Sequence, residues 1–296
     1  MKRFKHVMSA VLALVMLLTC ASPVFADSSD TYVALGADLS SSQRAQVLQM
    51  LGLTEDDLKD ISVTTITNQM EKDELGDYLP ASVIGSRALS SVKVVSNSSG
   101  GINVTTQNIS YCTVGMYKNA LITAGVENAD VTVAAPTYIS GTAGLVGAMK
   151  AYEGLTGDNL SSDNQDAAVN ELVTTGELAD QLGNTEDAEN LIALTKQKVA
   201  SENLSSDEDI LNAIKEAANE LNISITDDQA QMILDLMKKI SKLNLSEDQL
   251  RQQASDIYDR LQDLGIDMSQ YDKQTFIDKV SSLFGQFIDF CKSLFS

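Results

Sequence analysis

The residue pattern changes near the middle of the chain, and this change limits the possible folds more than any other feature. Residues 27–150 contain short runs rich in Val, Ile and Thr, bounded by Gly, Asn, Ser or Pro, which is typical of β-strands. Residues 151–296 contain longer runs with helical spacing of apolar residues. The sequence therefore predicts an α/β (or α+β) domain with about five strands over residues 27–155. An acidic all-helical region over residues 156–296 follows it.

The first part contains the order strand, helix, glycine, strand twice. The first helix begins after Ser40, which forms a capping-box pattern with Gln43, and Gly52 is placed to end it. The second helix is expected over 116–124, before Gly125. Each crossover has a length that suits a parallel strand pair. The expected strands lie at 32–35, 61–67, 92–95, 102–106 and 131–135, and the loop 96–101 predicts a hairpin between the third and fourth.

The helical region repeats one start signal. Ser205, Thr226 and Ser246 are each followed three residues later by Glu or Gln, as in a capping box. Acidic residues in a first helical turn also favour the helix dipole, so these acidic clusters have a structural explanation, and no stretch fits a calcium-binding loop. The predicted helices cover 164–182, 186–200, 210–221, 230–243 and 250–264.

The end of the chain predicts a phenylalanine-rich terminal helix. Apolar side chains recur there at alternating spacings of three and four, which forms a heptad seam. One interpretation is a helix docked on the core of the helical region. The other is a partner-binding or dimer surface, whose contact residues would be Phe284, Phe287 and Phe290.

Residues 1–26 have the pattern of a signal peptide, with a basic start, an apolar stretch and a small-residue cleavage site that ends at Ala26. We therefore expect a secreted protein with this segment removed. The apolar stretch is too short to span a membrane, and no transmembrane helix is expected in the mature chain. The single histidine, His6, lies in this segment. Its loss excludes Ser–His–Asp and Cys–His catalysis by the mature chain.

Charge and cysteine content limit the partners and the chemistry further. The formal net charge of −20 disfavours nucleic acid as a partner, because nucleic-acid binding needs clustered cations. Cys112 and Cys291 would remain after export. They are compatible with a disulfide or with two buried free thiols. No motif implies a cofactor or a metal ion.

Two segments are candidate ligand-binding sites. Ser140, Gly141 and Thr142 open a helix after a strand that is expected to end at Pro136, and the amide groups of a helix start can bind an anion. The alternative is an ordinary helix cap with close helix-to-sheet packing through small residues at 141, 144 and 147. Arg87 follows a glycine turn and is either an anion ligand or a surface ion-pair residue.

Ser90 and Lys93 match the Ser-x-x-Lys spacing of penicillin-recognising acyl transferases. That chemistry needs the serine at the start of a helix, with the lysine one turn later. Here the pair falls in a predicted strand, where residues three apart point to opposite faces. The spacing therefore does not indicate a catalytic pair.

Four segments carry a resemblance to a known family: 32–40, 79–91, 108–113 and 134–143. In these segments the chain resembles the YpuA-like family, exported proteins of Gram-positive bacteria that carry a domain of unknown function. The resemblance implies secretion and a common fold. It implies no activity, ligand or catalytic residue.

Together these observations give three functional hypotheses. The leading one is a non-enzymatic extracytoplasmic binding or interaction protein of the cell envelope, with an envelope protein or a wall component as its partner. The alternative is a carboxylate-dependent hydrolase of envelope glycan or peptide, which needs two acids that converge in a cleft. A third is a low-affinity calcium binder, because the chain has 41 acidic side chains.

Overall fold

The computed structural model describes residues 30–240, apart from 99, 202, 203 and 205, and then residues 243, 255, 258, 262, 272–275, 277 and 278. The predicted signal peptide, the Ser246 capping box and most of the predicted helix over 250–264 lie outside the described residues. The same holds for Phe284, Phe287, Phe290 and Cys291.

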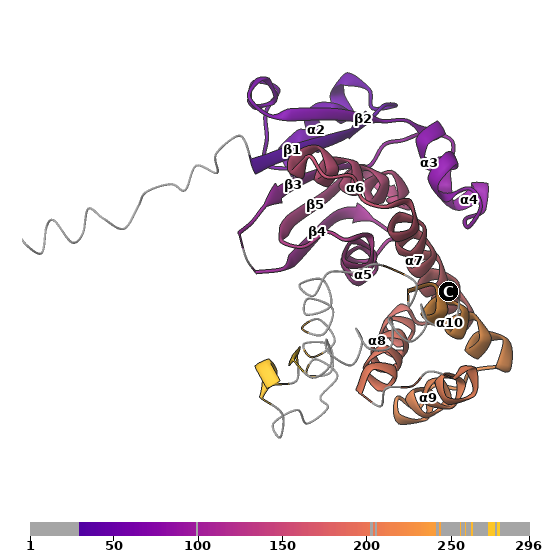
Figure 1. Ribbon diagram of the computed structural model, residues 1–296. Helices are drawn as coiled ribbons and strands as arrows, with labels where there is room; N and C mark the ends of the chain where they lie inside the picture. The colour runs from indigo at the N-terminus through magenta and orange to yellow at the C-terminus, as the bar shows by residue number, and fades with distance from the viewer. Residues whose placement is uncertain are drawn as a thin grey trace, which may run out of the picture.

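The first part of the chain forms one five-stranded mixed sheet (Figure 1). Its strands are β1 (Thr31–Gly36), β2 (Ser62–Ile66), β3 (Ser91–Ser96), β4 (Ile102–Ile109) and β5 (Ala129–Ile139). The spatial order is β2-β1-β3-β5-β4. The pairs β1–β2 and β4–β5 are parallel, and β3 runs antiparallel to β1 and β5. This sheet with its helices, followed by a helical region, confirms the predicted fold class.

Both predicted crossovers are present, because each parallel pair is joined by a helix. Helix α2 (Ser41–Met50) joins β1 to β2, and α5 (Val114–Ala124) joins β4 to β5. The Ser40–Gln43 capping box forms at α2 in both directions. Gly125 ends α5 in the left-handed conformation, with φ 103°. Local residue patterns were therefore sufficient to predict both strand–helix–strand crossovers.

The predicted hairpin is wrong, because β5 lies between β3 and β4. The loop between these strands passes over the start of β5. There the Gly101 amide donates to Asn128 Oδ1 at 2.8 Å, and the Asn97 amide donates to the Asn128 carbonyl at 3.0 Å. The β4–α5–β5 crossover returns β5 into this gap, where it gains a neighbouring strand on each side.

Strand β5 also continues three residues beyond Pro136, where the sequence predicted its end. Proline has no amide hydrogen and so cannot donate to a ladder hydrogen bond. At Pro136 none is needed. The pairing with β3 stops at Ala134, and the register with β4 shifts between Gln107 and Ile109.

The helices of the first part cover both faces of the sheet. Alternate side chains of β1 point to opposite faces, so Val33 and Leu35 pack on α2, whereas Ala34 belongs to the cluster on the other face. That other face is covered by α5 and by α6 (Thr142–Thr156). Three further short elements connect the strands: η2 (Asp57–Lys59), α3 (Asn68–Leu75) and α4 (Ala81–Ile84).

The second part is helical, as predicted. It contains α7 (Ser162–Leu182), α8 (Thr185–Ser201), α9 (Asp207–Glu220) and α10 (Asp227–Ile240). The Thr226–Gln229 capping box forms at α10. The predicted Ser205 cap is displaced by one residue, because Ser206 accepts the Asp209 amide at the start of α9.

Helix α7 links the two parts, since it packs on α5 and also contributes to the apolar core of the helical region (Figure 1). A polar contact joins the parts as well. Lys239 of α10 donates to Tyr78 Oη at 3.0 Å and to Asp166 Oδ2 at 3.1 Å.

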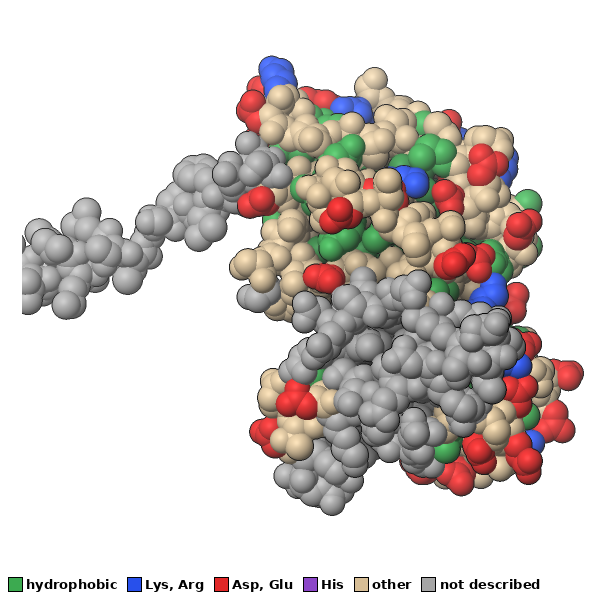
Figure 2. Space-filling model, in the orientation of Figure 1, with side chains coloured by type: hydrophobic (Ala, Val, Ile, Leu, Met, Phe, Trp, Pro, Cys, Tyr) green, Lys and Arg blue, Asp and Glu red, His purple; other side chains and the backbone are tan. Residues whose placement is uncertain are grey.

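On the face drawn in Figure 2, acidic side chains are numerous on the helical part. No helix in the described part of the chain is long and apolar enough to cross a membrane.

Candidate functional site

A pocket of about 390 Å³ opens at the edge of the sheet where the parallel strands β4 and β5 end. Ligands of open α/β sheets bind at this edge, outside the carboxyl ends of the strands. The four residues predicted to bind a ligand, Ser140, Gly141, Thr142 and Arg87, all line this pocket. Its other lining residues are Glu71, Ser82, Val83, Ile84, Gly85, Ser86, Leu89, Ser90, Ser110, Tyr111, Ile139 and Ala143.

The start of helix α6 forms one wall of the pocket. Gly141 is the N-cap residue, with φ 94°, and it has no side chain with which to cap the helix. The first amide groups of a helix have no partner within it. At α6 the Gly144 amide donates to the Gly141 carbonyl and to Ser90 Oγ, both at 2.9 Å. The two helical residues that precede it, Thr142 and Ala143, line the pocket.

Arg87 lines the same pocket from the loop that follows α4. The loop turns at Gly85, whose φ of 80° favours glycine. Arg87 is exposed and forms no ion pair or hydrogen bond with any residue that the structure describes. Of the described residues that line the pocket, Arg87 is the one cation, so its guanidinium is available to an anionic ligand.

Glu71 lies at the base of the pocket and was not identified from the sequence. Its side chain on α3 is 1 % exposed. Glu71 Oε1 accepts a hydrogen bond from Thr142 Oγ1 at 2.7 Å, and Oε2 accepts one from Asn68 Nδ2 at 3.2 Å. Burial raises the pKa of this carboxyl above its ordinary value, and the hydrogen bonds from Thr142 and Asn68 partly oppose that rise. No local pattern distinguishes Glu71 from the other acidic residues.

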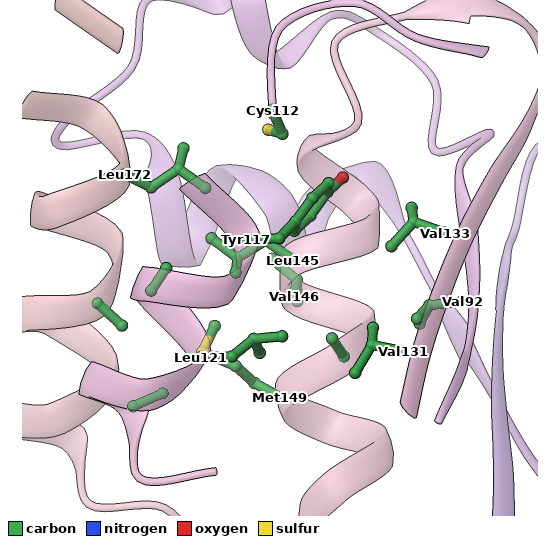
Figure 3. Close-up of a cluster of buried hydrophobic side chains, with 14 of the residues drawn as sticks. Val92, Cys112, Tyr117, Leu121, Val131, Val133, Leu145, Val146, Met149 and Leu172 are labelled. Carbon is green, nitrogen blue, oxygen red and sulfur yellow. The ribbon is translucent and has the colours of Figure 1, made fainter. Parts of the chain in front are cut away.

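Tyr117 and the small residues of α6 fix the start of this helix against its neighbours. The Tyr117 hydroxyl donates to the Gly141 carbonyl at 2.6 Å, and its ring lies among the buried side chains between α5 and α6 (Figure 3). A Cβ atom at Gly144 would lie 2.5 Å from Val133 Cγ1. The predicted close packing of α6 on the sheet is therefore confirmed. Whether the same segment binds an anion stays a prediction.

Helix α7 does not line the pocket but packs against one of its lining residues. Tyr111, which lines the pocket, packs against Gly176 of α7, and the space between them cannot hold a Cβ atom. Burial raises the pKa of the Tyr111 phenol well above its usual range. The position of Tyr111 in the pocket lining thus depends on its packing against α7.

Two other sequence features have structural roles here. Ser90 and Lys93 point to opposite faces of the sheet, since Ser90 contacts α6, whereas Lys93 Nζ donates to the Leu51 carbonyl at 2.7 Å. Cys112 is buried as a free thiol, and burial raises its pKa to about 12. Because Cys291 lies outside the described residues, their pairing stays a prediction.

A second pocket, of about 410 Å³, lies where α5 and α6 end. Its lining includes Glu127, Asp158 and Asp163. In the described part of the chain, no group of three or more His, Cys, Asp or Glu side chains is placed to hold a metal ion.

Comparison with known proteins places this fold in a family. A family model described as "Protein of unknown function (DUF1002)" matches residues 35–257. The chain belongs to the DUF1002 family. It is also 36 % identical over 286 residues to the uncharacterized protein YpuA of Bacillus subtilis (strain 168), and the match covers 96 % of each chain. No solved structure matches.

The DUF1002 match confirms the resemblance seen in the sequence, and it brings no activity with it. Three of the four segments that carried the resemblance, 79–91, 108–113 and 134–143, contribute residues to the pocket at the sheet edge. These segments are far apart in the chain, and the fold brings them together at one site.

Proposed function

We propose that this DUF1002 protein is a non-enzymatic extracytoplasmic binding protein of the cell envelope, and that it holds a small anionic ligand in the pocket at the start of α6. The observation that carries this proposal is the exposed guanidinium of Arg87, which has no hydrogen bond or ion pair with any described residue and lines the same pocket as the N-terminus of α6, where the cap residue is a glycine. A guanidinium binds a carboxylate or phosphate group through two parallel hydrogen bonds. Helix amide groups add further donors and a favourable dipole.

The net negative charge of the whole chain restricts where an anion can bind. With a formal net charge of −20, the surface as a whole repels anions. An anion is therefore expected to bind only where cations and donors are concentrated. The pocket volume of about 390 Å³ lies near the lower end of the range for small-molecule sites, about 300–1,000 Å³, which favours a small ligand.

The alternatives have less support at this pocket. A carboxylate-dependent hydrolase needs two acids in one cleft, and Glu71 is the one carboxylate among the described residues that line it. The calcium hypothesis gains no support from the described part of the chain: Glu127, Asp158 and Asp163 line the second pocket, but no group of three such side chains is placed to hold a metal ion. Binding of an envelope partner through Phe284, Phe287 and Phe290 stays a prediction from the sequence, as does export.

The test is a ligand screen by thermal shift on the chain without residues 1–26. The panel contains sulfate, phosphate, sugar phosphates, calcium and soluble wall fragments. A ligand that binds the folded state raises the melting temperature, and at a concentration of a hundred times its Kd it adds about 2.7 kcal/mol to the free energy of unfolding. We expect stabilisation by at least one anion, loss of that stabilisation in Arg87→Gln, and its retention in Lys59→Gln. The Lys59 control removes an exposed cation that pairs with Asp56, outside the pocket.

The proposal is wrong if no anion stabilises the protein, or if Arg87→Gln binds as well as the unsubstituted chain. Cleavage of wall fragments that is lost in Glu71→Gln would support the hydrolase in its place. Stabilisation by calcium alone would support the calcium binder.

A further inference from the structure

The carboxyl of Glu71, buried at the base of the pocket, is connected to the open part of the pocket through the hydroxyl groups of Thr142 and Ser140. Glu71 Oε1 lies 2.7 Å from Thr142 Oγ1, and Thr142 Oγ1 lies 3.3 Å from Ser140 Oγ. Thr142 is buried, whereas Ser140 is half-buried and lines the pocket. We call this group, Glu71, Thr142 and Ser140, the hydroxyl relay.

The direction of hydrogen bonding along the hydroxyl relay depends on the proton of Glu71. Each hydroxyl has one hydrogen to donate and can accept from a neighbour. When Glu71 is ionised, Thr142 donates to the carboxylate and Ser140 donates to Thr142. Ser140 then presents only lone pairs to the pocket, and these repel an anion.

Protonation of Glu71 reverses this order. The carboxylic acid can donate to Thr142, and Thr142 can then donate to Ser140. The hydrogen of Ser140 becomes available to a ligand at the pocket wall, and a buried negative charge close to that ligand is removed. Both changes favour an anion.

The groups around Glu71 shift its pKa in both directions. Asp38 acts on the carboxyl as a like charge and raises its pKa, and Lys72 on the same helix lowers it. Asn68 donates to its second oxygen. Cys112 and Tyr117 face it as neutral buried groups, and Arg87 is the cation of the same pocket. Burial outweighs the other effects, so the pKa of Glu71 is raised.

We propose that the pocket binds its anion together with one proton, which Glu71 takes up from solvent and which acts on the ligand through Thr142 and Ser140. This inference rests on the proposed anion-binding function. It assigns Glu71 and Thr142 as positioning residues that set the pH range in which the site is active. An anion in the pocket would in turn hold the proton on Glu71 more tightly, as thermodynamic linkage requires.

The experiment uses sulfate as the probe, because its charge stays constant over the pH range tested. The Kd of sulfate is measured by calorimetry at constant ionic strength between about pH 5 and about pH 8, in two buffers with different ionisation enthalpies. We expect the Kd to increase with pH, approaching about tenfold per pH unit above the pKa of Glu71, with uptake of one proton per sulfate in that range.

Three variants identify the group that takes up the proton. In Glu71→Gln, the carboxamide donates to Thr142 at every pH, so binding should be tight and independent of pH. In Thr142→Val, the hydroxyl relay is interrupted, so binding should be weaker and its pH dependence smaller, because only the charge of Glu71 still acts on the ligand. Asp73→Asn removes an exposed charge from the same helix and should keep the full pH dependence. Thermal melts show whether each variant is folded.

The outcomes separate this inference from the function on which it rests. Sulfate binding that depends on Arg87 but not on pH overturns the proton uptake and leaves the anion site intact. The same holds if the pH dependence survives in Glu71→Gln, or if it disappears in Asp73→Asn. Absence of sulfate binding at every pH, in a protein that another anion does not stabilise either, overturns the anion site itself.

Discussion

The glycines of α6 provide the sharpest test of how this helix is held on the sheet. Gly144 and Gly147 lie one turn apart and both face the strands. At Gly144, an added Cβ atom would lie 2.5 Å from Val133 Cγ1 and 2.8 Å from Tyr117 Oη, and both neighbours are fully buried. At Gly147, the shortest distance would be 3.0 Å, to Val92 Cγ1. An alanine should therefore be tolerated much better at 147 than at 144.

The magnitudes follow from two opposing effects. Replacing glycine by alanine inside a helix gains about 1 kcal/mol at either position. Overpacking a close-packed core costs about 1–3 kcal/mol. We expect the upper end of that cost at 144, which gives a net loss of about 2 kcal/mol, and the lower end at 147, which leaves stability nearly unchanged. For a chain of this size, the loss at 144 corresponds to a fall of about 4–8 °C in melting temperature.

The assay is urea denaturation of both variants beside the unsubstituted chain, with linear extrapolation of the free energy of unfolding. Tyr117→Phe serves as a second probe, because it removes the atom 2.8 Å from the added methyl group. It should recover part of the loss in Gly144→Ala and none in Gly147→Ala, a coupling that a double-mutant cycle measures. If Gly144→Ala is as stable as the unsubstituted chain, or less damaging than Gly147→Ala, the packing argument is refuted.

Two further predictions concern buried groups near the pocket. Glu71→Gln should raise the free energy of unfolding at about pH 7 but not at about pH 4, because the raised folded pKa makes ionisation of this carboxyl costly in the folded state. The cost is about 1.4 kcal/mol for each pH unit between its unfolded and folded pKa values. Denaturation at the two pH values measures the gain, and an equal gain at both would contradict the prediction. Cys112, with a pKa raised to about 12, should resist alkylation in the folded protein at neutral pH and react after unfolding. Mass spectrometry of the Cys112 peptide measures this, and fast labelling of the folded chain would show that the thiol is accessible.

Much of the architecture could be predicted from local patterns. The Ser40 and Thr226 capping boxes, the glycine at 125 and the helical spacing of apolar residues each depend on neighbours a few positions away, and each was confirmed. The two parallel pairs followed from the length of their crossovers. The one-residue error at Ser205 arose because Ser206 offers the same chemistry one position later.

The errors concern contacts between distant parts of the chain. A short polar loop between two strands normally predicts a hairpin, but β5 pairs with both strands and separates them. The continuation of β5 past Pro136 depended on where the pairing with β3 stops. Neither fact is present in the residues of the loop or around the proline.

The candidate site shows the same division. Local residue patterns were enough to predict that Ser140, Gly141 and Thr142 open a helix after a strand, because helix starts are governed by local hydrogen bonding. Long-range packing brings Arg87 into the same pocket as that helix start and buries Glu71 in its lining. The reason is physical: a carboxyl acquires an altered pKa from the desolvation and charges around it, and the fold alone assembles those surroundings.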